Sequence, residues 1–141
     1  TVGYYSTIGE QSLAPPTQRG YGAGQVTGPI AMLILMAARW QLSQEQLGTL
    51  LGLDSNEMHV VPLLLDGKIG LHGKDRQARI RHLLAIYGLL QSVFRDVNVG
   101  YAWLTEKKRV LGGDSPLERL MKGELEDILI VNRLAQTLAG Q

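Results

Sequence analysis

The residue types that usually do chemistry in proteins are sparse in this 141-residue chain. The three histidines, His59, His72 and His82, lie 13 and 10 residues apart, so they make no short metal-binding motif. The chain has no cysteine, which excludes a disulfide framework, a zinc finger, an iron–sulfur site and a thiol nucleophile. We therefore expect no bound metal and no other cofactor.

Two further patterns invite a catalytic interpretation, and each has a simpler explanation. Glu124, Glu126 and Asp127 cluster at the start of a predicted helix, where acidic side chains stabilise the helix dipole. The glycines of residues 22–28 look like a dinucleotide-binding loop, but no strand precedes them and no βαβ unit follows. Because no nucleophile, base and acid come together, we expect that the protein is not an enzyme.

Composition and charge argue against three further classes: disordered proteins, proteins that bind nucleic acid by bulk charge alone, and membrane proteins. Hydrophobic residues make up 45% of the chain, which is enough for a core, and 14 basic residues against 13 acidic ones argue against nucleic-acid binding by bulk charge alone. The longest apolar run, Ile30 to Ala38, is about half of what a membrane span needs. No signal-peptide pattern precedes it. We expect a soluble, cytoplasmic protein with no membrane partner.

The elements that must position any site are predicted to be all α-helical. Residues 1–28 contain six glycines and two adjacent prolines, which predicts an irregular, Gly-rich arm. Residues 30–40 are apolar nearly all round and predict a buried helix. A second helix, 44–51, is capped by Ser43 and stops at Gly52. A third opens at 53–55 with Asp54 or Ser55 as its cap, and Pro62 must end it or begin another turn.

The C-terminal half predicts longer helices. Residues 74–97 carry apolar side chains at steps of three or four, and Asn98 and Gly100 interrupt the pattern. A helix over 101–110 follows, then one that starts at Ser115-Pro116 and ends at Gly123, then a last one over 124–138. The expected organisation is an arm at 1–28, a first helical domain at 29–73 and a second at 74–141.

The stretch from Leu42 to Ser55 predicts a capped helix, a tight glycine turn and a second capped helix, which is the layout of a helix-turn-helix. It resembles the Xre family of repressors, in which a Ser-Gln-Glu-x-Leu start and a Leu-Gly turn recur. The resemblance implies that residues 29–73 form an Xre-like helix-turn-helix that binds promoter DNA. The side chains that we expect to contact DNA are Gln44, Ser55, Asn56, His59, Lys74 and Arg76.

The local charge leaves the DNA-binding hypothesis open. Residues 41–72 carry four acidic side chains and one lysine, which is a poor match for a phosphate backbone. Basic residues come next in the sequence. If they line the same face, the segment can bind DNA, and if they do not, it is a structural relic of a DNA-binding fold; these residues are Lys74, Arg76, Arg79 and Arg81.

A second resemblance covers nearly half the chain. Its motifs come in order: a long helix over 81–94, Ala102-Trp103-Leu104, the run Leu111-Gly-Gly-Asp-Ser-Pro-Leu-Glu-Arg-Leu120, and Gly123-Glu124-Leu125. With these motifs, residues 76–140 resemble the toxin-binding domain of the Xre/MbcA/ParS antitoxin family. One departure is that Lys107-Lys108 stands where many members have Pro-Asn.

This resemblance implies an antitoxin of a type II toxin–antitoxin system. Its partners would be a RES-domain toxin that depletes NAD and is encoded by the neighbouring gene, a second copy of the chain in a homodimer, and the promoter of its own operon. The helix over 30–40 and the arm are the expected dimer contact, and residues 124–141 are the expected plug for the toxin's active site. The candidate toxin-binding residues are Trp103, Leu117, Leu120, Glu126, Asp127, Asn132, Arg133 and Gln136.

Two other interpretations stay open from the sequence. Taken without the resemblance, the same apolar residues are better explained as the core of the domain itself, since apolar stripes usually face their own core. The alternative function is a stand-alone Xre-type transcriptional repressor with a helical ligand-binding or dimerisation domain.

Overall fold

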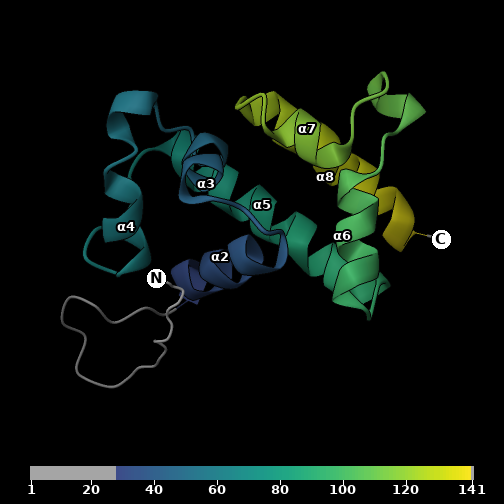
Figure 1. Ribbon diagram of the computed structural model, residues 1–141, viewed down its shortest axis with the longest axis horizontal. Coiled ribbons are helices and arrows are strands. Elements are labelled where there is room, and N and C mark those ends of the chain that lie inside the picture. The colour runs from purple at the N-terminus through teal and green to yellow at the C-terminus, as the bar shows by residue number, and fades with distance from the viewer. Residues whose placement is uncertain (1–27, 141) are drawn as a thin grey trace.

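The computed structural model of the protein describes residues 28–140. This part holds seven α-helices, two short 3₁₀ turns and no strand, which confirms the all-α prediction (Figure 1). The arm expected at 1–28 lies outside the described residues except for Gly28. The α-helices are α2 Gly28–Arg39, α3 Gln44–Leu50, α4 Val60–Leu65, α5 Lys74–Val93, α6 Val97–Thr105, α7 Pro116–Leu120 and α8 Leu125–Ala139.

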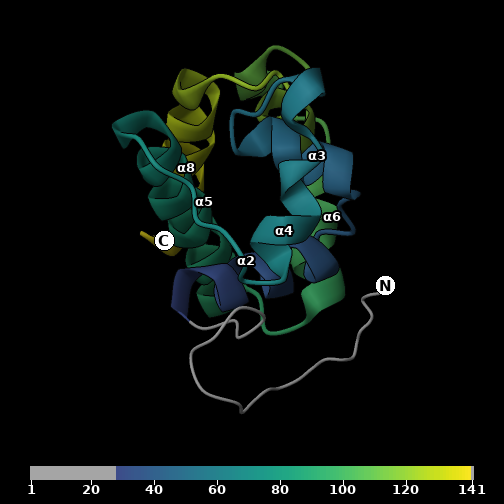
Figure 2. The ribbon, with the colours of Figure 1, turned by 90° about the vertical axis from the view of Figure 1, so that its left-hand side faces the viewer.

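Helix α5 is the centre of the fold. It packs against α2 on one side and along α8 on another, and the two perpendicular views agree on this arrangement (Figures 1 and 2). Leu83 and Ile86 of α5 are completely buried, as are Ile128 and Val131 of α8. These side chains belong to the same apolar cluster as residues of α2, α3 and α4, so one core extends from α2 to α8.

Two helix starts and one stop that the sequence marks are confirmed. The Ser43 hydroxyl accepts a hydrogen bond from the Gln46 backbone N–H at 3.0 Å, and the Gln46 amide oxygen accepts one from Ser43 at 2.9 Å. Ser115 and Glu118 cap α7 in the same reciprocal way. Gly52, just past α3, has φ +82°, a conformation that favours glycine.

The helix expected to open at 53–55 is shorter and broken. Only one 3₁₀ turn forms there, Ser55–Glu57, capped by Asp54, and α4 does not begin until Val60. A continuous helix from Ser55 would place the Pro62 ring against the carbonyl four residues earlier. Starting at Val60 puts Pro62 in the first turn, where no intrahelical N–H is needed.

The long helix ends earlier than the sequence predicts. Helix α5 stops at Val93, and α6 begins at Val97 instead of 101, so Asn98 and Gly100 lie inside a helix and do not interrupt one. The reason is a cap that the periodicity analysis missed: the Asp96 carboxylate accepts a hydrogen bond from the Asn98 N–H at 2.8 Å. Helix α6 then ends at Thr105, and a 3₁₀ turn follows at Arg109–Leu111.

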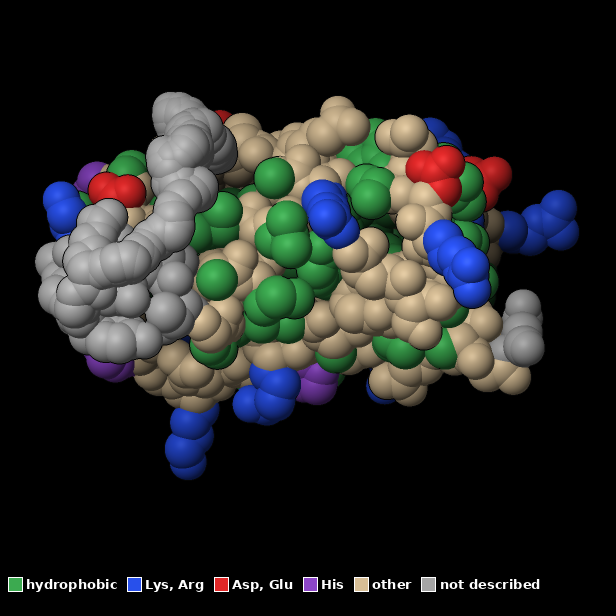
Figure 3. Space-filling model, turned by 90° about the horizontal axis from the view of Figure 1, so that it is seen from below, with side chains coloured by type: hydrophobic (Ala, Val, Ile, Leu, Met, Phe, Trp, Pro, Cys, Tyr) green, Lys and Arg blue, Asp and Glu red, His purple; other side chains and the backbone are tan. Residues whose placement is uncertain are grey.

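Helix α2 is only half buried, which corrects the prediction of a buried helix. Leu33 and Met36 are completely buried, whereas Met32 and Leu35 are 41% and 40% exposed. Figure 3 views the underside of the molecule, where α2 lies in Figure 1, and shows hydrophobic side chains gathered on that face. Among residues 28–140, no helix combines the length and apolarity that crossing a membrane requires.

Candidate functional site

The candidate DNA-binding side chains lie on the α3–α4 region and at the start of α5. Gln44 is the first residue of α3, Ser55 and Asn56 lie in the 3₁₀ turn, and His59 immediately precedes α4. All four are exposed, as is Lys74 at the start of α5. The hydrogen-bonding side chains therefore reach solvent, but Ser55 and Asn56 stand on a single 3₁₀ turn and not on an α-helix.

Arg76, the sixth candidate, has a partner within the chain. Its guanidinium donates to both carboxylate oxygens of Glu57 at 3.1 and 3.0 Å, which fixes the 3₁₀ turn to α5. The Glu57 carboxylate also accepts a hydrogen bond from the Asp54 N–H at 3.0 Å. That backbone bond, together with Arg76, lowers the pKa of Glu57 below its ordinary value.

The four basic residues of α5 do not share one face. Arg79 is buried and donates to Asp75 at 2.8 Å, so its charge faces the interior. Since Arg76 pairs with Glu57, only Lys74 and Arg81 remain on the outside, where they border an open hollow with Gly73 and Gln77. Two cations make a much smaller phosphate-binding surface than four.

Arg79 joins three parts of the fold at one buried point. Besides its contact with Asp75, it donates to the Gly123 carbonyl at 2.7 Å and to the Leu50 carbonyl at 3.5 Å. Leu50 is the last residue of α3, and Gly123 lies in the turn before α8. From the sequence, Arg79 was considered only as one of four basic residues that could line a DNA-binding face, because the carbonyls that it satisfies are distant in the chain.

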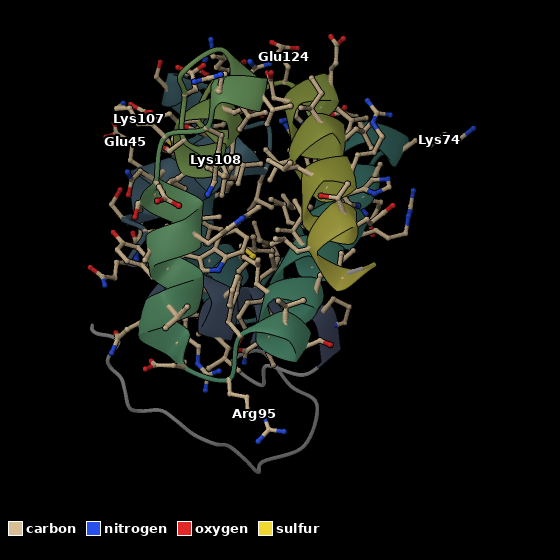
Figure 4. All side chains as sticks on the ribbon, turned by 90° about the vertical axis from the view of Figure 1, so that its right-hand side faces the viewer. Glu45, Lys74, Arg95, Lys107, Lys108 and Glu124 are labelled. Carbon is tan, nitrogen blue, oxygen red and sulfur yellow. The ribbon has the colours of Figure 1, made fainter. Side chains whose placement is uncertain are left out.

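The residues at the α6–α7 end form a packed scaffold. Leu120 is completely buried, and Trp103 and Leu117 are half buried against the core. The Lys108 ammonium lies 5.0 Å from the Trp103 ring centroid, within the range of a cation–π contact. Lys107 lies on the side of the molecule opposite Lys74 (Figure 4).

A charged cluster fixes the start of α7. Glu118 accepts hydrogen bonds from the Ser115 N–H at 2.8 Å and from the Lys107 ammonium at 2.9 Å. The backbone bond from Ser115 and the Lys107 contact lower the pKa of Glu118 to about 2. Lys107, where the sequence departs from the family pattern, thus pairs with the first turn of α7.

The polar candidates on α8 divide into inward and outward groups. Asn132 is buried and lies 3.1 Å from His82 Nδ1 of α5, and its amide oxygen accepts a hydrogen bond from Gln136 at 3.2 Å. Asp127 is mostly buried beside Arg119, at 3.7 Å. In the described part of the chain these residues hold α8 in place.

The outward group forms one stripe along α8. Glu126 and Arg133 are exposed and lie two helical turns apart on the same side, and neither has an ion pair within residues 28–140. Half-buried Leu129 and Ile130 lie between them, and exposed Gln136 continues the stripe. The surface is mixed, with apolar side chains flanked by one acid and one base.

Sequence reasoning did not single out two residues that organise this region. Arg119 donates to the Leu111 carbonyl at 2.9 Å and approaches Asp114 and Asp127, and His82 contacts Asn132. Arg119 stands in the run 111–120 and His82 in the long helix, but neither position shows which residues it contacts, because the packing of the helices brings these partners together. No group of three or more metal-ligating side chains occurs in residues 28–140.

The chain was compared with protein families, curated proteins and solved structures. No protein-family model, curated protein or solved structure matches this chain. The resemblance to the antitoxin family therefore depends on the quoted motifs alone.

Proposed function

We propose that this protein is an antitoxin that binds a RES-type, NAD-depleting toxin through its C-terminal helices and blocks the toxin's active site. The ordered motifs from Trp103 to Leu125 suggest the family, and the observation that carries the proposal is the two-sided character of α8. One side of α8 is buried against α5, and the other offers Glu126, Arg133 and Gln136 to a partner.

The outward side of α8 combines apolar and charged side chains, as protein–protein interfaces do. Apolar side chains, here Leu129 and Ile130, supply contact area, and charged side chains at the edge give orientation and specificity. Because Glu126 and Arg133 have no partner in the described chain, a toxin does not have to break an existing ion pair to reach them.

The test is a charge-reversed double variant, Glu126→Lys with Arg133→Glu. Co-expressed with the product of the neighbouring gene, the wild-type chain should co-purify with it, and the double variant should lose about tenfold or more in affinity. Arg95→Glu is the matched control, because Arg95 is also exposed and points away from the molecule at the end far from Glu124 (Figure 4).

Deleting α8 would not be a clean test. Ile128, Val131 and Ala135 are completely buried, so removal of the helix would open the core and unfold the protein. The antitoxin proposal fails if the wild-type chain does not bind the neighbouring product. The claim that the outward side of α8 contacts the toxin is wrong if the double variant binds as tightly as Arg95→Glu does.

The proposal includes repression of the antitoxin's own operon by a homodimer. Gln44, Asn56 and Lys74 are the exposed side chains best suited to contact bases and phosphates. The exposed apolar face of α2, with Met32 and Leu35, is the proposed dimer contact, and a dimer would contact two half-sites about one helical turn of DNA apart. A promoter gel shift with Asn56→Ala tests this part.

A further inference from the structure

One apolar side chain stands apart from all others in the described chain. Val110 is 73% exposed, whereas the next most exposed large hydrophobic residue, Val99, is 48% exposed. Val110 lies in the 3₁₀ turn Arg109–Leu111. The segment between α6 and α7 that contains this turn projects from the helices (Figure 1). A protein gains nothing within its own fold from holding a valine in water.

The backbone of this loop is closed by its own hydrogen bonds. The Lys108 N–H donates to the Asp114 carbonyl at 3.0 Å, and the Gly113 N–H donates back to the Lys108 carbonyl at 3.0 Å. Gly112 and Gly113 have φ +74° and +97°, which a residue with a side chain rarely adopts. The loop therefore has a defined shape that the glycine pair makes possible.

Side chains attach the loop to the helices below it. Leu111 is buried beside the exposed valine, and its carbonyl accepts a hydrogen bond from Arg119 of α7 at 2.9 Å. Lys107 pairs with Glu118 at 2.9 Å. A loop held in this way loses little conformational entropy when a partner covers its tip.

The charge beside the tip indicates the chemistry of the partner. Arg109 is exposed and has no ion pair within residues 28–140, whereas both neighbouring lysines are paired with glutamates. An arginine next to an apolar tip matches an apolar pocket that carries carboxylates at its rim.

We propose that the loop 108–114 is a preformed anchor that inserts Val110 into an apolar pocket of the toxin, with Arg109 pairing with acidic groups at the pocket's edge. This rests on the antitoxin function proposed above and adds a second contact, separate from the α8 stripe. A rigid and exposed apolar side chain gains contact area on binding without any reorganisation of its own chain.

The test measures the dissociation constant between the purified full chain and the purified product of the neighbouring gene. Val110→Asp should weaken binding at least about 30-fold, because a carboxylate would enter an apolar and acid-rimmed pocket. Arg109→Glu should weaken it by about tenfold. Val99→Asp is the matched control: it places the same charge on an exposed valine at the start of α6 and should bind like the wild type.

Each outcome decides between the two proposals. If the wild type binds and Val110→Asp binds equally well, the anchor is wrong and the antitoxin proposal stands. If the wild type does not bind at all, both are wrong. Circular dichroism should show that Val110→Asp and Val99→Asp are both folded, as expected for changes at exposed positions.

Discussion

Arg79 is the charged residue whose contacts link α3, α5 and the turn before α8. Its guanidinium is buried, and three acceptors from separate parts of the fold surround it: Asp75, the Leu50 carbonyl and the Gly123 carbonyl. A buried cation is stable only when its donors are satisfied, and the carbonyls in turn lose their partner if the cation is removed.

Arg79→Met keeps most of the side-chain volume and removes these hydrogen bonds. We expect it to lower the free energy of unfolding by about 2–3 kcal/mol in urea denaturation. Arg76→Met is the matched control on the same helix, where the pair with Glu57 is a third exposed and should contribute less than about 1 kcal/mol. Equal losses in the two variants would contradict the role assigned to Arg79.

The lowered pKa of Glu118 predicts how the stability of the protein changes at acid pH. Its pKa is about 2 in the folded protein against an ordinary value of 4.5, because the Ser115 N–H and then Lys107 stabilise its charged form. A lowered folded-state pKa contributes stability that is present above pH 4.5 and is lost as the pH falls toward 2. Glu118→Gln should therefore show a smaller loss of stability than the wild type in urea titrations between these pH values. An unchanged acid profile would contradict it.

At the scale of elements, the helix starts marked by a capping box were predictable, and the boundaries that depend on a single capping residue or on packing were not. The Ser43 and Ser115 caps depend on neighbours three residues away, so the sequence displays them directly. The break between α5 and α6 depends on Asp96, whose role as a cap was hidden within an apolar periodicity that continues to Val97. The sequence showed that Pro62 must end one helix or begin another turn. It did not show which, and the structure has a 3₁₀ turn at Ser55–Glu57 followed by a short α4 that contains Pro62.

The end of α3 gives a prediction for one glycine. Gly52 has φ +82°, and an added Cβ would lie 2.9 Å from the Arg79 guanidinium. Gly52→Ala should therefore lower the free energy of unfolding by about 1–3 kcal/mol in urea denaturation. Gly70→Ala is the control, since its Cβ would meet nothing within 4 Å, and we expect a change of less than about 0.5 kcal/mol. Similar effects of the two changes would refute this account of the turn.

At the scale of the whole molecule, the candidate surfaces belong to one packed body. The apolar cluster contains Leu47 and Leu50 of α3 as well as Ile128 of α8, and Arg79 ties the ends of these regions together. Residues 28–140 should consequently unfold in one cooperative transition.

The two tryptophans report on two different contacts in this body, Trp40 on the packing beside α5 and Trp103 on α6. Trp40 follows α2 and lies edge-on to Tyr87, at a centroid distance of 6.3 Å, and Trp103 lies in α6. In Trp40→Phe and in Trp103→Phe, the fluorescence of the remaining tryptophan should overlay the circular dichroism curve of the same variant during urea unfolding. A fluorescence transition separated from that curve would show that the region around that tryptophan unfolds independently of the rest.

The sequence predicted which candidate site residues lie on helices, but not which of their side chains are exposed. The periodicity placed Leu120 and Asn132 on helices, but whether a side chain points to solvent depends on how α7 and α8 pack, and both residues proved buried. Glu126 and Arg133 are exposed because they lie opposite the α5-facing side of α8. Val110 had no sequence signal, since only the closed loop around it makes its exposure unusual.

The most direct test of the antitoxin proposal is the NAD content of cells that express the neighbouring gene with and without this chain. The proposal predicts that the neighbouring product alone depletes NAD, that the wild-type chain restores it, and that the Glu126→Lys, Arg133→Glu double variant restores it less than Arg95→Glu. If NAD stays low in the presence of the wild-type chain, or never falls when the neighbouring product is expressed, the central claim is wrong.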